Sequence, residues 1–176
     1  VPLQDVAMAI AELDRLLHTI GLTGVELPSH VNGRALGDPQ LRPFFEAAAT
    51  WGAPIFVHPL RPGDMHRLVG PPALEQVLAF PGEIGLAGAS LVTSGLLAAL
   101  PDLRISLSHG GGTLAMLLPR LRHARGCVPP VRELLPHDPL DDVRRLWVDD
   151  LVYDAATLRH LVATFGADRV MAGTDY

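Results

Sequence analysis

The chain contains no lysine, because all 14 of its basic residues are arginines. It therefore offers no group for Schiff-base chemistry on lysine and no phosphate loop that depends on lysine. Charged residues make up only 19% of the sequence, the net charge is -5, and no basic run occurs. Since nucleic acids and anionic membranes are recognised by clustered positive charge, we expect neither as a partner and predict a small-molecule ligand.

Cysteine is almost as scarce. The single cysteine, Cys127, cannot form an intrachain disulfide, so nothing calls for an oxidising compartment and we expect a cytoplasmic protein. The first helix lacks the charged start, apolar run and cleavage site of a secretion signal. The uncharged stretch 84–100 contains several glycines and is shorter than the ~20 residues of a membrane span, so it is predicted to be a buried helix.

Apolar sequence, in contrast, is abundant: 48% of the 176 residues are hydrophobic, enough for a single domain over 1–176. Short apolar runs predict strands at residues 24–27, 54–58, 103–108, 146–152 and 169–172. Helical spacing predicts helices between them, at 6–20, 38–52, 72–80, 83–100, from 112 onward and at 155–165, with a looser proline-rich segment at 127–139. Strands that alternate with helices indicate a parallel α/β sheet, and both a doubly wound sheet and a barrel fit the pattern.

Three of the predicted strands end in side chains that bind metal ions. One strand ends in His58, the next leads directly into His109, and the last leads into Asp175. Because the carboxyl ends of parallel strands lie at one edge of a sheet, we expect these three side chains to converge. Two imidazoles and one carboxylate form a ligand set that Zn2+ and similar cations prefer.

Each of these residues also has a structural interpretation. His58 fits a hydrogen-bonded histidine at a strand end, and Asp175 fits a helix N-cap. The glycines after His109 fit a helix cap or a phosphate-binding loop. The segment 109–112 also fits the oxyanion loop of esterases, but no serine follows it in the sequence, which argues against a serine hydrolase. Cys127 is interpreted as a free structural thiol.

Four segments of the chain resemble signatures of the amidohydrolase-related family, in the branch that contains the aminocarboxymuconate semialdehyde decarboxylases. They are His-Val-Asn-Gly-Arg at 30–34, Phe-Val-His-Pro at 56–59, Ser-His-Gly-Gly-Gly at 108–112 and Gly-Thr-Asp-Tyr at 173–176. Their order and spacing match over nearly the whole chain. The resemblance implies a (β/α)8 TIM barrel of the metal-dependent hydrolase type, which normally takes ~250 residues. The chain resembles a partial barrel of about strands four to eight.

The resemblance also implies roles for individual residues. His58 and Asp175 correspond to metal ligands, with Zn2+ or another divalent ion such as Mn2+ as the expected cofactor. His109 corresponds to the catalytic acid/base. Arg120 corresponds to an arginine that binds the substrate carboxylate across the interface of a homodimer. His30 is expected to line the substrate pocket.

Other interpretations of these residues stay open, and the sequence departs from the family pattern in two places. Arg120 fits a solvated helix face, together with Arg122 and Arg125, and His30 fits a structural hydrogen bond. The chain has no His-x-His pair, which supplies two metal ligands in the family, and Leu60 stands where the family has a tryptophan. The second departure puts the aminocarboxymuconate substrate in doubt.

These observations leave three hypotheses about function. The first is a nonoxidative decarboxylase of an unsaturated or aromatic carboxylic acid, which uses a divalent metal. The second is a metal-dependent hydrolase or hydratase on the same scaffold, because the metal ligands are common to both. The third is an inactive fragment of such a barrel, since catalytic zinc typically has three protein ligands and the resemblance assigns only two here.

Overall fold

The predicted strands form one parallel sheet of five strands, in the order β1-β4-β5-β6-β7. The computed structural model describes residues 1–61 and 68–175. Tyr176 of the Gly-Thr-Asp-Tyr motif and His66, for which the sequence predicts no role, lie outside the described residues. The strands are β1 (Val25–Pro28), β4 (Ile55–His58), β5 (Ile105–Leu107), β6 (Trp147–Asp149) and β7 (Val170–Met171). All five therefore fall within the predicted runs or within one residue of them.

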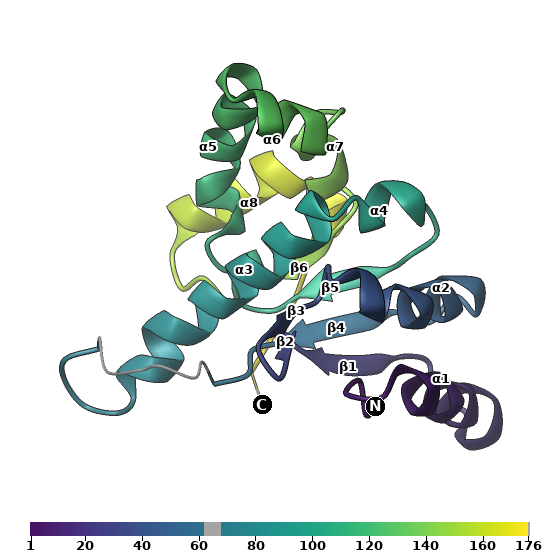
Figure 1. The fold of residues 1–176 in the computed structure, drawn as a ribbon. Helices are drawn as coiled ribbons and strands as arrows, with labels where there is room; N and C mark the ends of the chain where they lie inside the picture. The colour runs from purple at the N-terminus through teal and green to yellow at the C-terminus, as the bar shows by residue number, and fades with distance from the viewer. Residues whose placement is uncertain (62–67, 176) are drawn as a thin grey trace.

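The order of the strands decides between the two predicted architectures. Each strand of this sheet pairs in parallel with the next one along the chain, from β1 to β7, with no reversal. A doubly wound sheet reverses its strand order at a switch point, whereas a barrel adds its strands in one direction. Figure 1 shows β1, β4, β5 and β6 stacked in this order from bottom to top, with α5 and α8 above them. The sheet is thus a segment of a (β/α)8 barrel, as the resemblance implied.

The helices near the two ends of the chain begin and end where the sequence predicts. Helix α1 (Val6–Asp14) continues as a π-helical segment to Ile20 and ends at Gly21, whose φ of 83° is the left-handed conformation typical of a helix C-terminus. Helix α2 (Arg42–Thr50) follows a 3-10 turn that Asp38 caps. Helix α8 (Ala155–Phe165) is capped by Asp154, which accepts a hydrogen bond from the Thr157 N–H.

Two helical regions differ from the predictions. The helix predicted over 83–100 is two helices, α3 (Phe80–Thr93) and α4 (Leu96–Ala99), because Gly95 adopts a φ of 71° between them. The segment predicted to be loose follows α5 (Leu114–Cys127) and contains α6 (Pro129–Leu134) and α7 (Pro139–Val143). Pro129, Pro130 and Pro139 occupy first turns of these helices, where a missing N–H costs nothing, and Pro136 lies in the bend between them.

A short hairpin was also not predicted. Strands β2 (His30–Val31) and β3 (Arg34–Ala35) pair antiparallel around Asn32 and Gly33, whose φ values are 52° and 78°. An Asn-Gly pair is the preferred turn for such a hairpin, so the sequence did contain the signal. None of the helices in the described part of the chain is long and apolar enough to cross a membrane. The stretch 84–100 is helical as predicted, but it is divided between α3 and α4 and is buried only in part, since Leu86 is 65% exposed.

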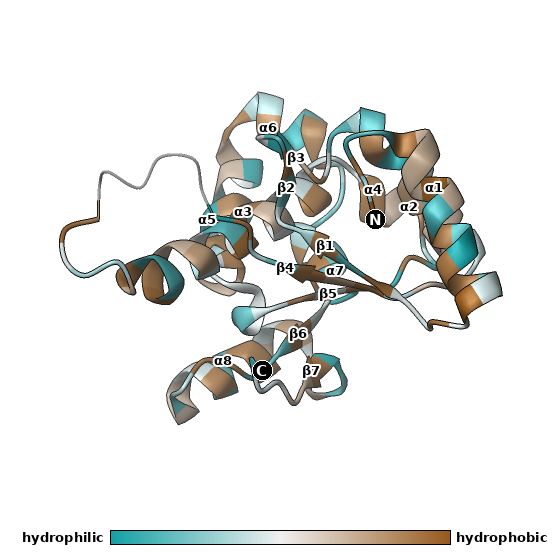
Figure 2. Ribbon diagram, turned by 90° about the horizontal axis from the view of Figure 1, so that it is seen from below, coloured by the Kyte–Doolittle hydropathy of each residue, from teal (hydrophilic) through white to brown (hydrophobic). Residues whose placement is uncertain are grey.

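The two faces of the sheet have different surroundings. Leu27, Val57, Leu107 and Val148 share one face by register and are each 1% exposed or less, because the helices pack on them. The strands are mostly brown, that is hydrophobic, in Figure 2, whereas α1 alternates between brown and teal. The residues between the buried ones point to the opposite face, which we call the inner face. It is partly open and carries Glu26, Phe56, His58, Ser106 and Trp147.

Candidate metal and catalytic site

Three side chains converge at the carboxyl edge of the sheet, as the strand ends predicted. Nε2 of His58 lies 3.6 Å from Oδ1 of Asp175, and Nε2 of His109 lies 3.9 Å from the same oxygen. The two imidazole rings are 5.5 Å apart between centroids. One ligand atom from each residue can be chosen so that all three lie within 4.8 Å of one another. The three residues come from β4, from the loop after β5 and from the segment after β7.

This arrangement fits a divalent cation. Two imidazole nitrogens and a carboxylate oxygen are ligands for Zn2+ or Mn2+, and catalytic zinc sites typically use three protein ligands. Within residues 1–61 and 68–175, no other group of three His, Cys, Asp or Glu side chains converges in this way. Asp175 has a φ of 59°, which L-residues seldom adopt, and such strain clusters at functional sites. The individual roles of the three residues stay predictions.

Two of the three residues, His58 and Asp175, border a cavity of about 480 Å3 on the inner face; His109 lies beside it, with Nε2 3.9 Å from Oδ1 of Asp175. His58, Ser108, Asp149 and Asp175 supply its polar groups near the carboxyl edge, and Phe56 and Met171 supply apolar surface. Glu26 lies deeper, because its register partner on β4 is Phe56, two residues before His58. The cavity therefore has polar groups at its mouth, and its deeper wall combines apolar side chains with the carboxylate of Glu26.

The glycine-rich loop after β5 has no backbone N–H group left to bind an anion from outside the protein. All four N–H groups of residues 109–112 donate inside the protein: those of His109 and Gly110 to the carboxylate of Asp149, and the other two to the carbonyls of Ser108 and His109. The phosphate-loop and oxyanion-loop interpretations are therefore wrong, since both need free N–H groups. The glycines are needed for space, because a Cβ on Gly112 would lie 1.9 Å from the carbonyl oxygen of Pro81.

His109 has one nitrogen held by the protein and the other facing the site. Its Nδ1 lies 3.0 Å from the hydroxyl oxygen of Ser108, while Nε2 points toward Asp175. Burial lowers the pKa of His109 below its usual value of 6.5; the negative charges of Asp149 and Asp175 oppose this shift but do not cancel it. The neutral imidazole is therefore the dominant form at neutral pH.

Sequence reasoning missed Asp149. This residue ends β6 on the inner face and is 3% exposed. A metal-binding type of side chain at the end of a parallel strand is the signal that identified His58 and His109, but the predicted strand ran to residue 152 and so placed Asp149 inside it. Ser108 was part of a quoted motif but received no role.

His30 does not reach the converging residues. It begins β2, and its Nδ1 accepts a hydrogen bond from the Gly33 N–H at 3.2 Å. It lines a different cavity of about 630 Å3, together with Glu83 and Ser90. The structural hydrogen bond considered from the sequence is present, and the substrate-binding role stays a prediction.

Arg120 is also outside this cavity. It is exposed on α5 and borders an apolar groove of about 720 Å3 that includes Leu117 and Val128. No carboxylate within the described residues lies within 4.0 Å of it. Within one copy of the chain, the structure therefore does not bring Arg120 to His58 and His109.

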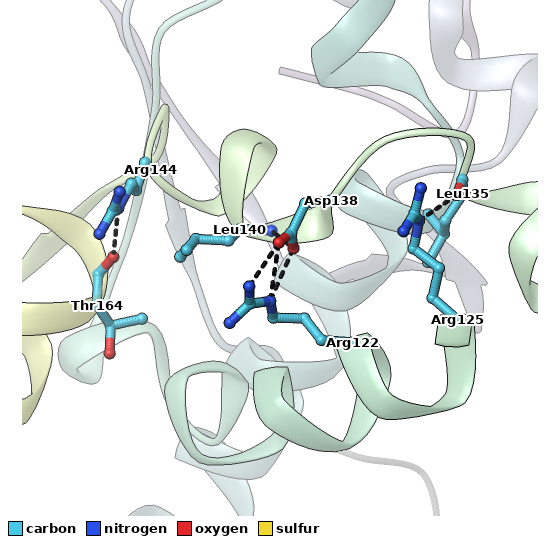
Figure 3. A network of polar contacts seen from close by, with 7 residues as sticks. All are labelled: Arg122, Arg125, Leu135, Asp138, Leu140, Arg144 and Thr164. Carbon is cyan, nitrogen blue, oxygen red and sulfur yellow. Dashed lines mark hydrogen bonds and ion pairs between the residues drawn. The ribbon is translucent and has the colours of Figure 1, made fainter. Parts of the chain in front are cut away.

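The other two arginines of α5 have structural partners (Figure 3). Arg122 donates to both carboxylate oxygens of Asp138, with N–O distances of 2.6 to 3.0 Å, and it lowers the pKa of that carboxyl group. Arg125 donates to the carbonyl of Leu135 at 2.7 Å. These contacts tie α5 to the segment that leads into α7, so Arg122 and Arg125 are not simply solvated.

The chain is similar over its whole length to one protein family and to several known decarboxylases. Residues 1–176 match the amidohydrolase family. The chain is 34% identical to the 2-amino-3-carboxymuconate-6-semialdehyde decarboxylase of Dictyostelium discoideum, over 100% of the chain and 49% of that protein. It is 27% identical to a crystal structure of 2,6-dihydroxybenzoate decarboxylase complexed with 2,6-dihydroxybenzoate, with a TM-score of 0.87 over 100% of the chain and 58% of that structure.

A further solved structure contains a metal ion. The 5-carboxyvanillate decarboxylase of Novosphingobium aromaticivorans, complexed with manganese and a nitrobenzoic acid, is 26% identical, with a TM-score of 0.86 over 100% of the chain and 53% of that structure. The chain spans about half the length of the relatives it matches. The sequence and the fold therefore point to the same group of proteins.

Proposed function

Because the chain belongs to the amidohydrolase family, we propose that the protein carrying it is a metal-dependent, nonoxidative decarboxylase of an unsaturated or aromatic carboxylic acid. The convergence of His58, His109 and Asp175 carries this proposal, together with the cavity that His58 and Asp175 border. The relatives support it, because their names describe decarboxylases that act on a carboxymuconate semialdehyde, a dihydroxybenzoate and a carboxyvanillate. We further propose that residues 1–176 form one continuous part of a single barrel domain, in a cytoplasmic protein.

We propose that His58 and Asp175 hold the metal ion, which is zinc or manganese. Manganese is present in the carboxyvanillate decarboxylase, and both ions accept nitrogen and oxygen ligands. When bound, such an ion polarises substrate oxygens and stabilises the negative charge that develops in the transition state.

His109 is the acid/base in this proposal. Loss of CO2 breaks a carbon–carbon bond and leaves an electron pair on the substrate carbon, which must gain a proton. Nε2 of His109 faces the site and can hold that proton, while the Ser108 hydroxyl keeps Nδ1 in place. Burial lowers the pKa of His109, so its neutral imidazole first takes up a proton at Nε2, and the imidazolium that results is a strong donor, as general acid/base catalysis near neutral pH requires.

Arg120 is proposed to bind the substrate carboxylate in a homodimer. Its guanidinium is exposed on α5 beside an apolar groove and lies outside the cavity of its own copy. An arginine in this position can serve the site of a second copy. Guanidinium and carboxylate groups pair through two parallel hydrogen bonds.

The test uses the protein at its full natural length, loaded with manganese or zinc. CO2 release is measured with 2,6-dihydroxybenzoate, 5-carboxyvanillate and aminocarboxymuconate semialdehyde as substrates. His109→Asn is expected to lower kcat by about 10²- to 10⁴-fold, the usual contribution of a general acid, without loss of bound metal. His137→Asn is the matched control, because His137 is exposed and lies outside the cavity. Conversion of a substrate or analogue without CO2 release would instead favour the hydrolase or hydratase hypothesis.

A further inference from the structure

A buried carboxylate that the proposed reaction does not use lies directly behind His109. Asp149 is 3% exposed, and no arginine or histidine in the described residues lies within 4.0 Å of its oxygens as an ion-pair partner. Its charge is compensated by three backbone N–H groups instead. Oδ2 accepts from His109 at 2.9 Å, and Oδ1 accepts from Gly110 at 2.7 Å and from Leu151 at 3.2 Å. A carboxylate is costly to bury unless hydrogen bonds such as these three compensate its charge.

The first two of these hydrogen bonds fix both peptide groups that flank the Cα of His109. The His109 N–H belongs to the peptide group before that Cα, and the Gly110 N–H belongs to the one after it. A single carboxylate thus restrains the φ and ψ angles of His109, one oxygen on each side. The φ of His109 is 53°, a conformation that L-residues seldom adopt without such support.

The backbone of His109 in turn determines where its imidazole points. With the Cα fixed, the direction of the Cα–Cβ bond is fixed, and the hydroxyl of Ser108 at 3.0 Å from Nδ1 sets the rotation of the ring. Nε2 then faces Asp175 at 3.9 Å. The neighbouring residue Asp150 acts similarly on the other loop, because its Oδ1 accepts from the Gly173 N–H at 2.9 Å, two residues before Asp175.

We infer that Asp149 is a positioning residue for the proposed reaction: it holds the backbone of His109 in the left-handed conformation that aims Nε2 at the site. This inference rests on the proposed function for its catalytic consequence. It assigns Asp149 no contact with the substrate or the metal ion. The carboxylate acts through two hydrogen bonds to the main chain, and the imidazole ring itself needs no partner on Asp149.

Asp149→Asn is the decisive variant, made in the protein at its full natural length. An amide has the same shape as a carboxylate but only one acceptor oxygen, so at least one of the N–H groups now faces an NH2 group. We expect kcat to fall about 10- to 100-fold, as for other residues that orient a reacting group, while KM and the bound metal stay unchanged. Hydrogen exchange at the amides of His109 and Gly110 is expected to become faster.

Asp154→Ala is the matched control, because it removes the cap of α8 and lowers stability without contact to the loop. Its kcat is expected to stay at the wild-type value at temperatures where the protein is folded. If Asp149→Asn keeps a wild-type kcat and loses only stability, as the control does, the positioning role is wrong and the proposed function stands.

A second measurement needs neither the variant nor an active enzyme. In the wild-type protein, the amides of His109 and Gly110 should exchange slowly and should show the downfield proton shifts of hydrogen bonds to a carboxylate. If the wild-type protein releases no CO2, the proposed function fails, and amide exchange then decides the inference about Asp149. Fast exchange at both amides in the wild type would overturn it.

Discussion

The protonation of His109 depends on its burial. Burial lowers the pKa of this imidazole, so between its folded pKa and its usual value of about 6.5 the unfolded chain binds more protons than the folded chain. The free energy of unfolding therefore falls as the pH falls through this window. Above the window His109 is neutral in both states, and the folded state has its full stability. The His109→Gln variant should lack this part of the pH dependence.

Urea unfolding without divalent ions tests this prediction between about pH 8 and about pH 5, the range over which histidines titrate. The wild-type protein should lose more stability than His109→Gln on acidification, and His137→Gln should follow the wild type. Parallel curves for the wild type and His109→Gln would show that His109 is not buried in its neutral form.

The positions of the strand ends allowed three residues of the candidate site to be predicted, but not a fourth residue, Asp149. His58, His109 and Asp175 were identified because each follows a predicted strand, and the structure brings them together. Asp149 ends the observed strand β6, and it was missed because the predicted strand ran three residues further, to 152. The contacts of Arg120 could not be predicted, because they depend on which surface α5 presents and on whether a second copy is present.

Helix α3 lies so close to the loop after β5 that a glycine is required at one position. A Cβ on Gly85 would lie 2.0 Å from the hydroxyl oxygen of Thr113 and 2.8 Å from its nitrogen, whereas a Cβ on Gly82 meets nothing within 4 Å. We expect Gly85→Ala to lower the free energy of unfolding by about 1 to 3 kcal/mol through overpacking. Gly82→Ala should raise it by roughly 0.5 to 1 kcal/mol, because alanine favours the helix.

Thermal and urea unfolding of both variants measure these changes, and each variant serves as the control of the other. Equal effects of the two substitutions would mean that α3 does not pack against Thr113 as described. Thr113 directly follows the glycines of the loop that contains His109. Gly85→Ala should therefore also lower the catalytic activity, because it displaces this loop.

Elements were predictable where local signals agree and not where packing decides. Asp154 and Gly166 bracket a helix of the length that the apolar pattern predicts, and α8 is observed with these bounds. The break at Gly95 and the helices within 127–139 were not predicted, since a glycine between apolar residues fits both a buried helix and a helix end. Prolines likewise indicate loops and first turns of helices alike.

Metal binding should stabilise the whole molecule, because the three converging residues come from segments far apart in the sequence. An ion that binds only the folded state adds about 2.7 kcal/mol to the free energy of unfolding at 100 times its Kd. We expect manganese or zinc to raise the melting temperature of the protein at its full natural length and EDTA to reverse the change. His58→Ala should abolish this response.

His137→Ala should keep the full response to the metal, since this residue lies outside the cavity. Calorimetric melting with and without the ion measures both variants. An equal metal-induced shift in His58→Ala and in the wild type would place the metal elsewhere in the protein.

The overall architecture was predictable only through the family resemblance. Alternating strands and helices fit a doubly wound sheet and a barrel equally well, because local sequence does not specify which strands pair. The sequential strand order resolves this choice, and the TM-score of 0.87 to a dihydroxybenzoate decarboxylase agrees with it. The absence of a His-x-His pair and the presence of Leu60 in place of a tryptophan are departures from the family pattern, and the structure gives no reason for either.

The alternation along β4 has an evolutionary consequence. Val57 is fully buried beneath the helices, and the next residue, His58, opens onto the cavity. Neighbouring residues of the strand are thus under separate selection, one for the stability of the fold and the other for chemistry in the cavity. Substitutions at the residues that face the cavity can change substrate preference among descendants. The alternate residues, which face the helices, stay unchanged and conserve the scaffold.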